Sequence, residues 1–202
     1  MSRWRPDGAD RLQAAAFDLF DEQGFEGTTV AEIARRAGLT QRTFFNHFPD
    51  KREVLFNLSS AFEREVVDGI AGHRDGSPPL DVVVAALQLA SDATFEGRRA
   101  AVTRRHNIIR ANPDLLEREL GKQAALTDAI ATALRERGLA PDTAVLAAGA
   151  GMLVQQTAVR SWILADDGTP LRRHLSDALR ALRTTVAPAS PDPGLLHGGG
   201  GK

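Results

Sequence analysis

Residues 28–55 read TTVAEIARRAGLTQRTFFNHFPDKREVL. Thr29 and Glu32 have the spacing of a capping box, which predicts that a helix begins at residue 30. Apolar side chains then recur with helical periodicity until Gly38, and a glycine at that place ends a helix in the left-handed conformation. The stretch therefore opens with one short amphipathic helix.

A second short helix follows after a turn of a few residues. Thr40 is suited to cap a helix over residues 41–47, and Pro49 prevents that helix from continuing. Two short helices joined by a glycine-containing turn match a helix-turn-helix, in which the second helix lies in the major groove of DNA. The sequence thus indicates a DNA-binding element.

Charge is unevenly distributed, although the net charge of the chain is only -1. Residues 12–32 carry five carboxylates and no basic side chain, whereas residues 33–52 carry five basic side chains and one carboxylate. A local concentration of basic side chains favours contact with phosphates, whatever the net charge of the chain. The basic window coincides with the helix-turn-helix.

The second helix divides into an inward and an outward side. Phe44 and Phe48, with Leu39, are expected to be held by the neighbouring helices, because so short a helix is not stable alone. Arginine can donate two hydrogen bonds to guanine, glutamine can pair with adenine, and threonine can touch a thymine methyl group. The side chains left for the outer side are Gln41, Arg42, Thr43, Asn46 and His47.

The rest of the chain also reads as helices, and no segment shows the alternation of a strand. We predict a first helix from Asp10 to Gly24 and a fourth over about 51–70, which a second capping box, formed by Asp50 and Glu53, is expected to open. A linker spans residues 71–79, and the tail 188–202, rich in proline and glycine, is expected to be disordered. Further helices are expected at about 81–97, 100–110, 113–137, 142–165 and 170–186, and Asn112 is expected to cap the helix over 113–137. The fold class is therefore all-α, with about nine helices.

The composition is that of a soluble globular protein, with 43% hydrophobic and 25% charged residues among 202. Cysteine is absent, which favours an intracellular, cytoplasmic location and excludes disulfides and thiolate chemistry. The first ten residues contain no apolar run typical of a secretory signal. The uncharged stretch 143–159 is too short to span a bilayer comfortably, so no membrane association is expected.

No catalytic pattern is evident. The five histidines lie far apart in the sequence, and no phosphate-binding loop, zinc-protease motif or nucleophile elbow occurs. We expect no metal, no cofactor and no enzymatic activity. A small all-α enzyme that uses His106 with a nearby carboxylate remains a minor alternative.

Together with the preceding AAAFDLFDEQGF, the quoted stretch resembles the TetR family of transcriptional regulators over about residues 10–60. The resemblance implies a three-helix DNA-binding domain over 1–52, a connecting fourth helix, and a helical ligand-binding and dimerisation domain over 53–187. It departs from the family at Phe45, where a tyrosine usually offers its hydroxyl to a phosphate. Phe45 can make only van der Waals contact there.

The resemblance also implies roles for individual residues. Thr29 and Thr40 are expected to bond phosphates, His47 to touch the DNA backbone, and Lys51 to meet a phosphate at the start of the fourth helix. Gln41 and Arg42 are expected to read bases, and Arg3 and Arg5 to lie on an arm near the minor groove. Phe45 reads equally well as a core residue.

The implied function is that of a homodimeric repressor on a pseudo-palindromic operator, released by an unidentified small-molecule inducer. The last two helices would form the dimer. The small residues of 144–154 and a stripe on the final helix suit such an interface; that stripe consists of Leu171, Leu175, Leu179, Leu182 and Val186. The alternative is a dimeric adaptor that binds a protein instead of an operator.

Residues of the ligand site follow less directly from the sequence. Gln155, Val159 and Trp162 share one helical face, which is consistent with a pocket wall, although core packing explains the pattern more simply. Phe62, Phe95 and His106 are expected to point into the same space.

Overall fold

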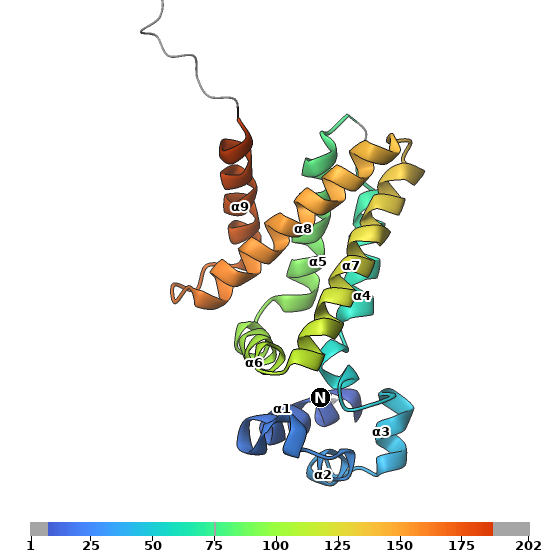
Figure 1. Cartoon of the computed structure of the whole chain (residues 1–202), viewed down its shortest axis with the longest axis vertical. Coiled ribbons are helices and arrows are strands. Elements are labelled where there is room, and N and C mark those ends of the chain that lie inside the picture. The colour runs from blue at the N-terminus through green and yellow to red at the C-terminus, as the bar shows by residue number, and fades with distance from the viewer. Residues whose placement is uncertain (1–7, 75, 188–202) are drawn as a thin grey trace, which may run out of the picture.

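The computed structural model describes residues 8–74 and 76–187, and within these ranges every regular element is a helix (Figure 1). The predictions for Arg3, Arg5 and the tail 188–202 lie outside the described residues. The all-α prediction is confirmed. The elements are α1 (Gly8–Gly27), α2 (Val30–Arg36), α3 (Gln41–His47), the 3₁₀ helix η1 (Glu53–Phe56), α4 (Ser59–Ala71), α5 (Pro79–Phe95), α6 (Arg99–Arg110), α7 (Pro113–Glu136), α8 (Pro141–Leu164) and α9 (Leu171–Val186).

Most boundaries lie within two residues of the predicted ones, because proline and glycine mark them. Pro79, Pro113 and Pro141 each occupy the first turn of a helix, where the missing amide hydrogen costs nothing. Two boundary details differ from the prediction. α1 begins at Gly8, so Asp10 lies inside it, and helical structure resumes after Gly24, whose φ is 79°. Asn112 occupies the N-cap position of α7, but its side chain donates to the carbonyl of Ile108 and makes no capping hydrogen bond.

The predicted fourth helix is wrong in its first two turns. The Asp50 carboxylate accepts from the amides of Arg52 and Glu53, as expected of a cap, but residues 53–56 form a 3₁₀ turn and α4 begins only at Ser59. Val54, Leu55 and Phe56 are all buried. Three consecutive buried residues do not fit one face of an α-helix, where successive side chains point about 100° apart.

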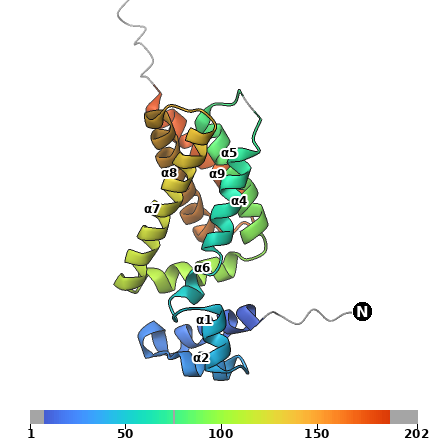
Figure 2. The ribbon, with the colours of Figure 1, turned by 90° about the vertical axis from the view of Figure 1, so that its right-hand side faces the viewer.

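Two buried clusters form the molecule. The first joins α1, α2, α3 and η1 and also takes in Ile108, Ile109 and Leu115 from α6 and the start of α7. The second joins α4, α5, α7, α8 and α9. In Figures 1 and 2, α6 lies directly above α1, between the small lower bundle and the upper one. The chain passes from one cluster to the other between Phe56 and Phe62.

The small residues of α8 pack within the chain. A Cβ atom on Gly151 would lie 2.3 Å from Cγ1 of Val83, so α5 and α8 approach closely at this point. Ala144, Ala147 and Ala148 are buried in the same cluster. Ala144, Ala147, Ala148 and Gly151 therefore pack within the chain, and the predicted use of residues 144–154 in a subunit interface is left to the opposite side of α8, where Leu146 and Leu153 are exposed. Leu171 and Leu175 of α9 are likewise buried within the chain.

Candidate DNA interface and effector cavity

α2 begins with the predicted capping box. The Thr29 hydroxyl accepts from the Glu32 amide at 3.3 Å, and the Glu32 carboxylate accepts from the Thr29 amide at 2.9 Å. The same carboxylate accepts from the Thr29 hydroxyl, and these bonds lower the pKa of Glu32 below its usual value. The Thr29 side chain is thus engaged in holding the start of α2.

α3 is anchored by two phenylalanines. Phe44 is completely buried and Phe48 nearly so, with their ring centroids 5.5 Å apart. The neighbouring Phe45 is 54% exposed, and its ring meets that of Phe44 edge-on. The predicted core positions of Phe44 and Phe48 are confirmed, and Phe45 belongs to the outer side.

The outward side of α3 carries the side chains predicted to meet DNA. Gln41, Arg42, Asn46 and His47 are exposed. Thr43 is half-buried, and its hydroxyl lies 2.9 Å from that of Thr40, which caps the helix by accepting from the Thr43 amide. The structure thus brings the polar residues of this short helix to one accessible surface.

Two of the five basic side chains of the 33–52 window form ion pairs within the described part of the chain. Arg36 binds the Glu22 carboxylate through two nitrogens, and Arg52 binds Asp50. Among the described residues, no ion pair involves Arg35 or Arg42. The two arginines of the window without an ion pair therefore lie at the end of α2 and on α3.

Lys51 lies in the connection after α3 and faces the interior. Its ammonium donates to the carbonyls of Phe25 at 2.8 Å and Thr28 at 3.1 Å, and it lies 4.4 Å from the centroid of the Phe25 ring. No α-helix begins at this residue. The phosphate contact of Lys51 remains a prediction, and a phosphate would compete with these acceptors.

Replacing Lys51 with methionine is expected to lower the free energy of unfolding by about 1.5 to 3 kcal/mol, the usual contribution of hydrogen bonds to a charged group. Urea unfolding followed by circular dichroism measures the loss. Arg52→Met is the control, because the exposed Arg52–Asp50 pair should contribute less than about 1 kcal/mol. Equal losses in the two variants would contradict a structural role for Lys51.

Arg11 is a residue of this region that the sequence analysis missed. Its guanidinium reaches from α1 to the carbonyls of Ala37 and Gly38, in the turn between α2 and α3. This contact fixes the turn and hence the direction of α3. An arginine one turn inside α1 carries no sequence signal for such a partner, because the contact depends on the packing of three helices.

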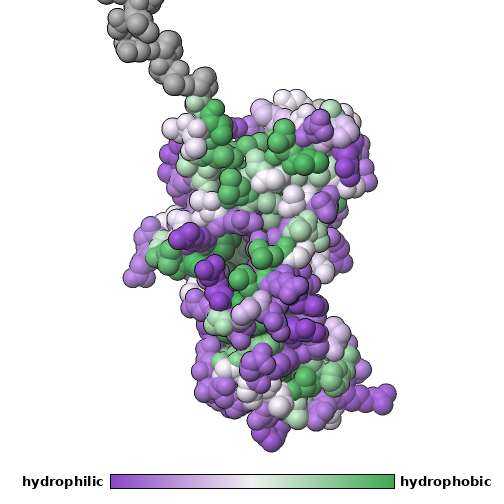
Figure 3. All heavy atoms as spheres, viewed as in Figure 1, coloured by the Kyte–Doolittle hydropathy of each residue, from purple (hydrophilic) through white to green (hydrophobic). Residues whose placement is uncertain are grey.

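A cavity of about 450 Å³ lies in the upper bundle, between the end of α5, the start of α6, the end of α8 and the α8–α9 connection. In Figure 3 the surface is hollowed beside the arm that this connection forms. Phe95 and Trp162, two of the predicted ligand-site residues, line the cavity. Phe62 packs behind Phe95, with the two ring centroids 5.2 Å apart.

The other three predicted ligand-site residues do not line this cavity. Val159 packs against the second buried cluster, and Gln155 is half-buried. His106 is half-buried on α6, and burial, followed by the charge of Arg110, lowers its pKa. For Val159, core packing is the better interpretation. Ser91, by contrast, lines the cavity and was missed, although a serine in the apolar register of Val84 and Leu87 was a visible signal.

Comparison with known proteins agrees with this architecture. The sequence model described as bacterial regulatory proteins of the tetR family matches residues 12–58, which span α1 to η1. The chain belongs to the TetR family. It is therefore a DNA-binding transcriptional regulator, and the family is not one of enzymes.

The similarity of this TetR-family chain to known regulators extends beyond the DNA-binding part, both in sequence and in structure. The regulator EthR of Mycolicibacterium smegmatis is 29% identical over 69% of this chain and 67% of its own length, and EthR of Mycobacterium tuberculosis is 27% identical over 90% and 89%. The crystal structure of Thermus thermophilus FadR, a TetR-family repressor in complex with lauroyl-CoA, is 26% identical and has a TM-score of 0.51. That alignment covers 92% of this chain and 98% of FadR.

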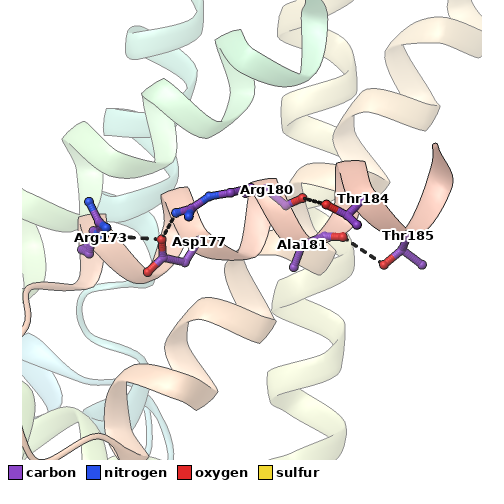
Figure 4. Close-up of a pocket in the computed structure, with 6 residues that line it drawn as sticks. All are labelled: Arg173, Asp177, Arg180, Ala181, Thr184 and Thr185. Atoms are coloured by element: carbon purple, nitrogen blue, oxygen red, sulfur yellow. Dashed lines mark hydrogen bonds and ion pairs between the residues drawn. The ribbon is translucent and has the colours of Figure 1, made fainter.

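The described part of this TetR-family chain contains no group of three His, Asp or Glu side chains that could hold a metal ion. No helix in that part is long and apolar enough to cross a membrane. A second, shallower recess lies along α9, but all six residues around it belong to that helix (Figure 4). Asp177 forms ion pairs there with Arg173 and Arg180, so its charge is compensated within the helix.

Proposed function

We propose that this regulator is a homodimeric repressor that binds a pseudo-palindromic operator through α3 and is released by a small-molecule inducer. One observation carries the DNA-binding part of the proposal. Gln41, Arg42 and Asn46 project from a helix whose opposite side is fixed by the buried Phe44 and Phe48. The likeness to FadR, a repressor crystallised with an acyl-CoA, supports repression and small-molecule control.

In this proposal the residues of α3 have separate tasks. Arg42, which has no ion-pair partner among the described residues, donates to a guanine edge, and Gln41 pairs with an adenine. Thr40, Thr43, Asn46 and His47 contact sugars and phosphates, which fix the position of α3 on the duplex without selecting the sequence. Phe45 makes apolar contact beside them.

A second copy of the chain is proposed to pack on α8. Leu146, Leu153 and Leu164 are more than half exposed and lie on one face of this helix, at positions i, i+7 and i+18. Gly149 lies on the same side with open space around it, which permits close approach of another helix. Figure 3 shows apolar atoms gathered over the upper part of the molecule, where α8 and α9 lie. Large exposed apolar side chains in a row are typical of an interface.

α6 is the proposed connection between the effector cavity and the DNA-binding part. Its first residue, Arg99, lines the cavity. One and a half turns later Arg104 binds Asp18 and Asp21 of α1, and Arg105 donates to the carbonyl of Leu55 in η1. A ligand that shifts α6 would therefore move α1 and change the distance between the two recognition helices of the dimer. That separation must match successive major grooves about 34 Å apart.

The proposal is tested by selecting bound duplexes from a random library and titrating the recovered sequence. We expect an inverted repeat. Arg42→Ala should then lose about 1 to 3 kcal/mol of binding free energy and relax the base preference at one position of each half-site.

Arg35→Ala is the matched control, because it removes the same charge from the other unpaired arginine of the window. It should weaken all duplexes to a similar, smaller extent and change only the salt dependence. Binding by Arg42→Ala that equals that of the parent would refute the role of α3. Recovery of no preferred duplex would favour the adaptor alternative.

A further inference from the structure

The cavity holds two polar groups that have no hydrogen-bond partner among the described residues. Ser91 is only 2% exposed, and its Oγ makes no hydrogen bond in the described part of the chain. Nη2 of Arg99 is also buried without an acceptor. Both residues line the cavity. Buried polar groups in proteins are almost always hydrogen-bonded, and an unpartnered donor costs about 1 to 3 kcal/mol, more when it is charged.

The rest of the cavity wall explains why Arg99 stays unpaired. Its guanidinium lies over the ring of Trp162, with Cζ 5.9 Å from the ring centroid. This contact holds the Arg99 side chain in place but supplies no acceptor. Of the two carboxylates that line the cavity, Asp92 is paired with Arg172 at 3.4 Å, and Glu96 is exposed to solvent. Arg99 is thus the one cationic group of this lining without an ion pair.

Apolar surface lies beside these donors. The rings of Phe95 and Trp162 and the side chain of Leu171 line the same space. A volume of about 450 Å³ is within the range of small-molecule sites. The cavity therefore combines an apolar wall with one positive charge and one hydroxyl.

We propose that the effector is a small organic acid whose carboxylate binds Arg99 and Ser91 while its apolar part lies against Phe95 and Trp162. The role as effector rests on the proposed function, whereas the binding itself does not. Two donors match the two oxygens of a carboxylate, and a charged acceptor compensates a guanidinium with a buried, unpartnered Nη2 better than a neutral acceptor does. A phosphate dianion fits less well, because Asp92 and Glu96 lie in the same wall and would repel the additional charge.

The test uses the full chain carrying Trp4→Phe, so that Trp162 is the only tryptophan and its fluorescence reports on the cavity. Decanoate and 3-phenylpropionate are titrated against their primary amides, which keep the shape and lose the charge. At least one acid should bind about tenfold or more tightly than its amide, as expected of a charge-assisted bond. Ser91→Ala should weaken binding of that acid by a smaller factor.

Arg99→Gln should remove the preference for the acid, whereas Arg98→Gln, which makes the same change at the exposed neighbouring residue, should retain it. Circular dichroism of each variant shows whether the fold is intact. Weak binding of both acids, equal binding of acid and amide, or an acid preference that survives in Arg99→Gln would overturn the proposal.

The operator provides a separate measurement. If the acid that binds also releases the parent protein from the selected duplex but does not release Arg99→Gln, both the site and its role as effector site are supported. Binding that depends on Arg99 but leaves the DNA complex unchanged supports the carboxylate site and refutes its role in induction. The failure of the site and the failure of the proposed function are thereby distinguished.

Discussion

Replacing both Leu146 and Leu153 with glutamate is expected to yield a monomer and to weaken operator binding by about a hundredfold or more. Both side chains are more than half exposed in the single chain, so the substitutions should leave the fold intact. A charge at each position, duplicated across a two-fold axis, would have to be buried against its symmetry mate. The loss in DNA affinity follows because two linked recognition helices gain about 10²- to 10⁴-fold in avidity over one.

Analytical ultracentrifugation gives the mass, and titration of the selected operator gives the affinity. Leu120→Glu, at a leucine of α7 that is 56% exposed, is the control for adding a charge to an apolar surface site elsewhere. A half-site duplex supplies a second control, because the double variant should bind it as well as the parent does. A dimeric double variant with full operator affinity would exclude α8 as the interface.

The order of elements could be predicted from local signals alone. Capping boxes, prolines in the first helical turn and Gly38 mark where helices begin and end, and these depend on residues a few positions apart. The extra two turns predicted for α4 show the limit of such signals. Asp50 caps its own turn, but the Glu53 carboxylate, which the pattern placed back on the amide of residue 50, binds Arg118 and Lys122 of α7. Tertiary contacts decided the outcome there.

The candidate sites show the same division. The outer face of α3 could be predicted, because Phe44 and Phe48 define its inner face by helical spacing. The interior position of Lys51 could not, since its carbonyl acceptors lie more than twenty residues earlier in the chain. Of the six residues predicted for the ligand site, only Phe95 and Trp162 line the cavity. Ser91 and Arg99 meet there because α5, α6 and α8 converge, which no periodicity within one helix reveals.

Replacing Phe44 with alanine is expected to lower the free energy of unfolding of the DNA-binding part by about 3 to 5 kcal/mol, the usual cost of removing a buried phenylalanine ring. Phe44 has no exposed surface and meets the rings of both Phe45 and Phe48. α3 has seven residues and is too short to be stable without this packing. The variant should therefore also lose specific DNA binding, because Gln41 and Arg42 are no longer held in one orientation.

Phe45→Ala is the matched control for this substitution, because it removes the same ring from the adjacent residue, which is 54% exposed. Its free energy of unfolding should stay within about 0.5 kcal/mol of the parent, as is usual at surface positions. Urea titration followed by circular dichroism compares the two variants, and titration of the operator shows the effect on binding. The first buried cluster also includes Ile108, Ile109 and Leu115. Disruption of this cluster in Phe44→Ala should therefore also loosen the packing of α6. Equal stability of the two variants would mean that α3 is not held through Phe44, and the orientation of its polar face would then need another cause.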